Sequence, residues 1–170
     1  VLFLVIAYSL GGLRFKEIPF LDSFTSAMHF VGPMLFALTL TETRFDLRVW
    51  LVTLSFTLWG MASHAFGAVQ DIRADREAGI ASIATVLGAK ATVRIAFVMY
   101  LVAGVTTLFL GDRYPQAALA ALPYLFVVGR EWQITDDTCE QANRGWRRFI
   151  FLNFLAGAIV SAVIIGPQPS

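Results

Sequence analysis

Apolar residues along this chain gather into long runs, and short charged segments separate one run from the next. Each run is apolar nearly all round rather than along one stripe, which is typical of helices embedded in lipid. A helix needs about 20 apolar residues to cross the bilayer core. The pattern predicts six segments, the first of them cut short: 1–13, 23–40, 49–70, 91–110, 116–129 and 149–165. We therefore predict an all-α fold, a multi-pass transmembrane helical bundle.

Composition supports a membrane protein and argues against several other classes. Hydrophobic residues make up 57% of the chain and charged residues 15%, whereas an average soluble domain carries about 25% charged residues. The net charge of +1 and the lack of a basic tract give no indication of nucleic-acid binding. Because the chain begins inside an apolar run, we expect residues 1–170 to be one membrane-embedded domain that lacks its N-terminal part.

Lysine and arginine are distributed unevenly between the two sides of the predicted bundle. If every segment spans, ten of them lie on one side and three on the other, which is a clear positive-inside bias. The larger set is Arg14, Lys16, Arg73, Arg76, Lys90, Arg94, Arg130, Arg144, Arg147 and Arg148, and the smaller set is Arg44, Arg48 and Arg113. The side with ten basic residues should be cytoplasmic.

Asp71 and Asp75 follow directly on the apolar segment 49–70 and are one helical turn apart. On a helix, carboxylates at this spacing share a face about 6 Å apart and repel each other. Near lipid they are also poorly solvated, so a divalent cation between them and a ligand explains the arrangement. Mg²⁺ is typically held by one or two carboxylates together with substrate phosphates. Gly79, four residues further on, lets the backbone turn or approach a neighbour closely.

A solvated loop at the membrane interface is the alternative explanation for this acidic pair, with Arg73 and Arg76 neutralising the carboxylates. A basic cluster on the same predicted side favours the metal site. Arg14 and Lys16 can hold a diphosphate there, the arginine through its planar fork and the lysine as a point charge. An acidic and a basic cluster on one side suit a metal–diphosphate site better than either cluster does alone.

Two other groups of titratable residues are weaker candidates. His64 lies two helical turns before the acidic pair, on about the same face, and could act as a proton acceptor or an orienting group. Asp136, Asp137 and Glu140 lie in the segment 130–148, which we interpret as a long solvated loop that could cap the site.

The acidic motif resembles that of a known family. Asp71-x-x-x-Asp75-x-x-x-Gly79 is similar to the second aspartate-rich motif of the UbiA-type intramembrane prenyltransferases. The stretches RFKEIPFLDS, HFVGP, FGAVQDIRADREAGIASIATVLGA and WRRFIFLNFLAG together resemble the lycopene elongase branch of that family, which prenylates carotenoid ends. This resemblance runs over nearly the whole chain.

The basic cluster also matches a motif of this family. Tyr8-Ser9 followed by Arg14-x-Lys16 is similar to the family's Tyr-Ser-x-Pro-Pro-x-Arg-x-Lys motif. Glycines at positions 11 and 12 replace the usual prolines, and this replacement could loosen the helix end that positions the two basic side chains.

The resemblance implies a reaction and a set of site residues. Members have nine transmembrane helices, of which this chain would contain the end of the fourth through the ninth, and a first aspartate-rich motif would lie upstream. By resemblance, Mg²⁺ and a prenyl diphosphate bind at the cytoplasmic face of a prokaryotic plasma membrane, and the prenyl group passes to a hydrophobic acceptor. We expect the isolated fragment to be inactive. The implied roles are metal binding and catalysis for Asp71 and Asp75, diphosphate binding for Tyr8, Arg14, Lys16 and Arg76, and a structural role for Gly79.

Other functions remain compatible with the sequence. Within the enzyme class, a quinone precursor or another aromatic molecule could replace the carotenoid as acceptor. A cation transporter would also use membrane carboxylates, although transporters more often place them at mid-membrane in discontinuous helices. A purely structural membrane subunit gives no reason for acidic and basic clusters to converge on one side.

Overall fold

The computed structural model describes residues 2–112 and 114–166, so Arg113 of the charge count lies outside the described residues. Every element among those residues is helical, as the sequence predicts. The elements are α1 (Leu2–Ser9), η1 (Phe15–Glu17), α2 (Leu21–Leu40), α3 (Leu47–Val69), α4 (Ile72–Glu77), α5 (Ile83–Leu87), α6 (Ala89–Thr107), η2 (Tyr114–Ala121), α7 (Leu122–Gly129), η3 (Asp136–Gln141), α8 (Ala142–Trp146) and α9 (Phe149–Ile165).

Three helices, α2, α3 and α6, are long and apolar enough to cross a membrane, and the bent pair η3–α8 and α9 makes a fourth if it is one span. Segment 116–129 of the sequence prediction forms η2 and α7, which together are shorter than a span. Pro123 lies in the first turn of α7, where the 3-10 helix gives way to an α-helix. These findings confirm the predicted multi-pass helical bundle.

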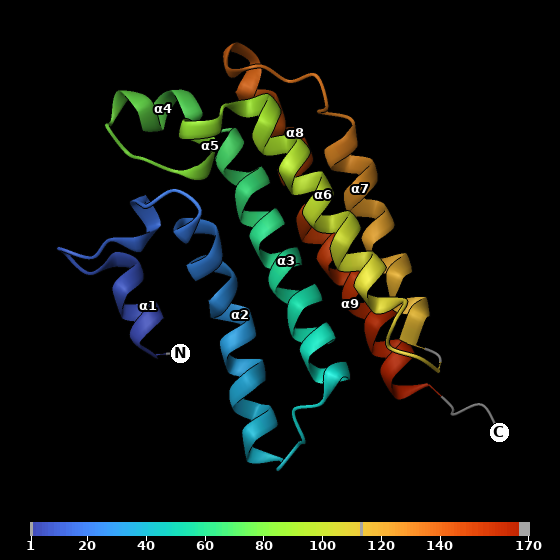
Figure 1. Cartoon of the computed structure of the whole chain (residues 1–170). Coiled ribbons are helices and arrows are strands. Elements are labelled where there is room, and N and C mark those ends of the chain that lie inside the picture. The colour runs from blue at the N-terminus through green and yellow to red at the C-terminus, as the bar shows by residue number, and fades with distance from the viewer. Residues whose placement is uncertain (1, 113, 167–170) are drawn as a thin grey trace.

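Helix α3 lies at the centre of the bundle, between α2 on one side and α6 on the other (Figure 1). The packing of α2 on α3 depends on Gly60, because a Cβ there would come within 2.9 Å of the Ala27 Cβ. On the other side, aromatic rings fill the core: the Tyr100 and Tyr124 rings stack with their centroids 4.9 Å apart. The core therefore ties α3, α6, α7 and α9 into one body.

The hydroxyl groups of the two buried core tyrosines find partners on neighbouring helices. The Tyr124 hydroxyl donates to Asn153 Oδ1 at 2.6 Å and links α7 to α9. Ser63 of α3 and the Tyr100 hydroxyl of α6 lie 2.7 Å apart. Such pairs satisfy polar groups that would otherwise lose hydrogen bonds in an apolar surrounding.

The two ends of the bundle differ in what they carry. Helices α4, α5 and α8 gather at one end, and the acidic motif lies there (Figure 1). The connections after α2 and after α6 lie at the other end, where Arg48 pairs with Asp112 at 3.2 Å. We call the first of these the motif end.

Candidate active site

The acidic pair lies where α3 ends and the short helix α4 begins. Helix α3 ends at Val69, and Asp71 is the residue before α4. The amide of Asp75 donates to the Asp71 carbonyl oxygen at 2.8 Å, so the two residues are joined by a helical turn. This places Asp71 at the N-cap of α4 and Asp75 in its first turn, both at the motif end of the bundle.

Neither carboxylate of this pair has a cationic partner among the described residues. The two nearby arginines are engaged elsewhere: Arg73 pairs with Glu140 at 3.3 Å, and Arg76 pairs with Asp136 at 2.7 Å. Burial raises the pKa of the Asp71 carboxyl above its usual value. Burial also raises the pKa of Asp75, and the neighbouring negative charge of Asp71 raises it further. The interpretation in which Arg73 and Arg76 neutralise this pair is therefore wrong.

Gly79 provides a left-handed turn at the end of α4. Its φ angle is +69°, a conformation that glycine adopts at little cost. The next amide, of Ile80, donates to the Asp75 carbonyl oxygen at 2.8 Å and closes the helix end in the manner of a Schellman cap. A Cβ at Gly79 would meet nothing within 4 Å, so the glycine serves the turn rather than a close approach.

Asp22, at the start of α2, anchors the segment that follows the acidic motif, and the sequence analysis missed it. Its carboxylate is fully buried and accepts the Ile83 amide at 2.9 Å and the Ser23 amide at 2.6 Å. His64 Nε2 of α3 lies 3.7 Å from the same carboxylate. In the sequence, Asp22 is a single acidic residue at the edge of an apolar segment. That position does not indicate which groups its carboxylate would bind. Asp22 thus joins α2, α3 and α5.

The family-type basic cluster lies on α1 and η1, next to the start of α2 at the motif end (Figure 1). Arg14 forms an ion pair with Glu17, and Lys16 is half-buried. The Tyr8 ring packs edge-on against His29, with the centroids 5.2 Å apart. Within the described residues, no hydrogen bond or ion pair joins these side chains to the acidic pair. Their diphosphate role therefore stays a prediction.

The segment 130–148 is not the solvated loop that we expected. It forms η3 and α8, and Cys139 and Ala142 are fully buried against the rest of the bundle. Asp136 accepts hydrogen bonds from Arg76 and from the Ala89 amide, both at 2.7 Å, and so joins α4 to the first turn of α6. This segment holds the two arginines of α4 away from the acidic pair.

We expect Asp136→Ala to lower stability more than Arg76→Gln does. The aspartate caps the first turn of α6, and loss of such a cap costs about 1–2 kcal/mol. The ion pair with Arg76 is partly exposed and contributes less than about 1 kcal/mol. Thermal unfolding of the purified protein in detergent measures both variants. Asp137→Ala, at an exposed neighbour, is the matched control, and equal losses for all three variants would contradict this assignment.

The acidic pair fits one side of a magnesium site. The described residues hold no group of three or more histidine, cysteine, aspartate or glutamate side chains that could hold a metal by themselves. One exposed and one half-buried carboxylate, neither with a cationic partner among the described residues, nevertheless match the way Mg²⁺ is held, by one or two protein carboxylates with phosphate oxygens and water. The pair could bind such an ion together with a phosphate-bearing ligand.

The fold and the site define a class of protein, a multi-pass helical membrane protein with a carboxylate pair at one end of its bundle. The model of the UbiA prenyltransferase family matches residues 1–155. The chain belongs to this family.

Within this family, the chain is similar to curated relatives with carotenoid-related names. The chain is 48% identical over 161 residues to a lycopene elongase/hydratase of Corynebacterium glutamicum, a match that covers 95% of this chain and 56% of the relative. It is 51% identical over 165 residues to the C(50) beta-cyclic carotenoids biosynthesis protein LbtBC of a Dietzia species, covering 96% of this chain and 38% of that protein. The chain thus spans about half the length, or less, of these relatives. No solved structure matches it.

Proposed function

We propose that the protein transfers a prenyl group from an allylic diphosphate to the end of a carotenoid such as lycopene. The observation that carries this proposal is the pair of carboxylates Asp71, which is exposed, and Asp75, which is half-buried, whose neighbouring arginines are paired elsewhere. Relatives that share about half of the chain's residues are named for lycopene elongation and carotenoid biosynthesis. Acceptor choice rests on those relatives, and the diphosphate chemistry rests on the site.

The acidic pair would hold Mg²⁺ together with the diphosphate of the donor. When bound, the ion would supply electrostatic stabilisation of the negative charge on the departing diphosphate. Because the chain spans only part of its relatives, we propose that the opposing ligands come from the portion that it does not include. The fragment alone would then be inactive.

The basic residues of the motif end would orient the leaving group. Arg14 and Lys16 can donate to diphosphate oxygens, and Tyr8 lies on the adjoining helix α1. Arg76 is already bonded to Asp136 and to the Thr85 carbonyl oxygen, so it would act on the diphosphate only by exchanging one of these partners. Its present contacts support a role in holding α4 and α5 together.

Water exclusion and proton transfer complete the proposed reaction. An allylic cation must be shielded from hydrolysis, and an apolar helical bundle provides that shielding. After the new carbon–carbon bond forms, the cation left on the acceptor must lose a proton to a base, or add a water molecule that then loses a proton to a base. His64, next to the buried Asp22 carboxylate, is the candidate proton acceptor on this chain.

The motif end would face the cytoplasm. The basic residues of the described chain gather at this end, and only Arg44 and Arg48 lie toward the other. The positive-inside rule supports this orientation, and the bacterial sources of the relatives support a prokaryotic plasma membrane.

A turnover assay tests this function. Membranes containing the protein as its gene encodes it are supplied with dimethylallyl diphosphate and lycopene, with Mg²⁺ or with EDTA, and products are analysed by mass. We expect prenyl units to be added to lycopene only with Mg²⁺. Product from a quinone precursor but not from lycopene would retain prenyl transfer and reject the carotenoid. Absence of diphosphate release with every acceptor would favour cation transport instead.

A further inference from the structure

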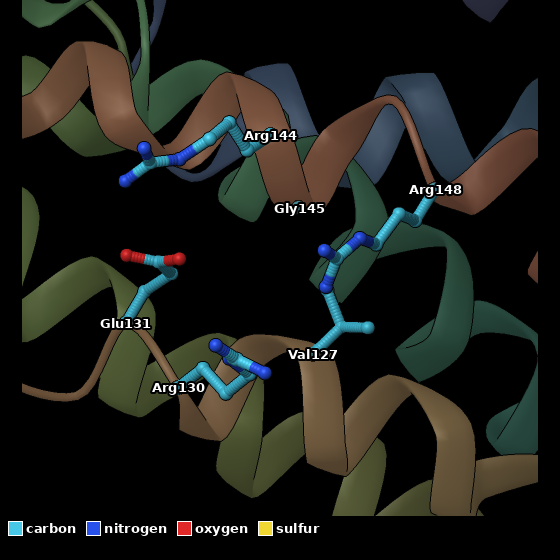
Figure 2. Close-up of a pocket in the computed structure, with 6 residues that line it drawn as sticks. All are labelled: Val127, Arg130, Glu131, Arg144, Gly145 and Arg148. Carbon is cyan, nitrogen blue, oxygen red and sulfur yellow. The ribbon is translucent and has the colours of Figure 1, made fainter.

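A hollow lined by arginines lies between α7 and the junction of α8 with α9. Its volume is about 330 Å³. Figure 2 shows arginine and glutamate side chains from the two segments pointing toward one another across this space. The residues that line it are Val127, Arg130, Glu131, Arg144, Gly145 and Arg148. We call this hollow the arginine pocket.

Helix α8 packs closely against its neighbours beside the arginine pocket. This close packing fixes the backbone positions of the arginines that line the pocket. A Cβ at Gly145 would come within 2.9 Å of the Phe66 ring and 3.1 Å of Val127, which means that only glycine lets α8 lie this near. Arg144 and Arg148 lie on either side of this contact point. The helices η3–α8 and α9 meet there at a bend of 49°.

Charge in the arginine pocket is not balanced. Three guanidinium groups surround one carboxylate, Glu131, and none of the four forms an ion pair or hydrogen bond through its side chain with another described residue. Elsewhere among the described residues, four arginines have carboxylate partners: Arg14, Arg48, Arg73 and Arg76. The pocket thus keeps an excess positive charge of two, which suits an anion.

The surroundings of the pocket indicate what the anion is attached to. Arg130 lies over the ring of Phe126, with its Cζ 5.8 Å from the ring centroid. Phe126 is 65% exposed, and Ile150 and Phe151, just after Arg148, are 64% and 76% exposed. Exposed apolar side chains next to a cationic hollow match a lipid whose phosphate enters the pocket while its acyl chains lie along α7 and α9.

We propose that the arginine pocket binds the phosphate group of an anionic membrane lipid. Planar guanidinium groups bind phosphate through paired, charge-assisted hydrogen bonds, and three of them converge here. This site is separate from the candidate active site, because none of its lining residues comes from α1, η1 or α4. The bound lipid would fix the angle between α7 and the bent α8–α9 pair.

Lipid retention tests the proposal directly. The purified protein, as its gene encodes it, is stripped of lipid in detergent and offered equal amounts of phosphatidylglycerol and phosphatidylcholine. Retained lipid is then counted by mass spectrometry of the intact complex. We expect the unmodified protein to prefer phosphatidylglycerol. Each arginine removed should weaken that binding about fivefold to tenfold, so Arg144→Gln combined with Arg148→Gln should lose most of it.

Matched variants separate the pocket from general surface charge. Arg147→Gln removes an exposed arginine between these two positions that does not line the pocket, and it should leave lipid retention unchanged. Arg144→Lys with Arg148→Lys keeps the charge and should retain part of the preference. Equal loss in the Arg147→Gln variant would overturn the proposal.

Two further outcomes would also overturn it, and the first of them requires no variant to fold. One is equal retention of the two lipids by the unmodified protein. The other is binding of inorganic phosphate or diphosphate, detected by calorimetry, that depends on Arg144 and Arg148 while phosphatidylglycerol has no advantage. The latter would assign the pocket to a soluble phosphate compound and reject a lipid.

Discussion

Replacing either Asp71 or Asp75 with asparagine should reduce Mg²⁺-dependent prenyl transfer by about a thousandfold or more, because a metal–carboxylate interaction supports charge development at the leaving diphosphate. Asparagine keeps the size of the side chain but removes the negative charge. Neither carboxylate has a cationic partner among the residues that the structure describes, so the change leaves no buried cation without its counter-ion. Turnover is measured in membranes, with the amount of inserted protein determined for each variant.

Asp137→Asn provides the matched control for this experiment. Asp137 is an exposed carboxylate at the same end of the bundle, and its loss should leave activity unchanged. Raising the Mg²⁺ concentration should recover part of the activity in the Asp75→Asn variant, since one carboxylate remains. Full activity in both single variants would reject the metal site, while equal losses in all three would indicate a general effect of charge.

The long helices could be predicted from the sequence because their signal is local. A continuous apolar run shows where the chain must satisfy its backbone hydrogen bonds within one segment. The predicted segments 23–40, 49–70, 91–110, 116–129 and 149–165 agree with the structure to within three residues at each end. Short helices such as α4, α5 and α8 escaped prediction, because five or six residues with mixed polarity give no clear period.

Partners of the charged residues could not be predicted in the same way. Arg73 and Arg76 lie beside the acidic pair in the sequence, and a local interpretation assigns them to it. Their actual partners are Glu140 and Asp136, which are 67 and 60 residues away along the chain. The packing of η3 against α4 brings these groups together, and no local pattern along the chain indicates that proximity.

Some properties of the acidic motif could be predicted from the local sequence, and others depend on residues far away along the chain. Its spacing and its place after an apolar helix could be predicted from the chain, whereas for Gly79 the sequence left a turn and a close approach as alternatives and the structure shows the turn. That its two carboxylates are left without cations depends on distant residues. The ion pairs of Arg73 and Arg76 with distant carboxylates leave the acidic pair without cationic partners, and the four-residue spacing places its two carboxylates one helical turn apart.

The second large effect is expected at Asp22, where replacement by alanine should lower the stability of the folded protein by about 3–5 kcal/mol. The substitution leaves the Ile83 amide and the Ser23 amide without their acceptor at a fully buried position. At roughly 2–4 °C per kcal/mol for a chain of this size, the apparent Tm should fall by about 6–20 °C. Thermal unfolding of the purified protein in detergent measures the change.

Graded substitutions show whether the hydrogen bonds to Asp22 cause this loss. Asp22→Asn keeps one carbonyl oxygen and should lose less stability than Asp22→Ala, since one amide still finds an acceptor. Asp112→Ala breaks an exposed ion pair at the opposite end, with Arg48, and should cost less than about 1 kcal/mol. The Gly79 turn connects Ile83 to the acidic motif on α4. Loss of the hydrogen bond that holds the Ile83 amide should therefore also weaken Mg²⁺-dependent turnover in the fraction of protein that remains folded. Similar Tm values for Asp22→Ala and Asp112→Ala would refute the anchoring role.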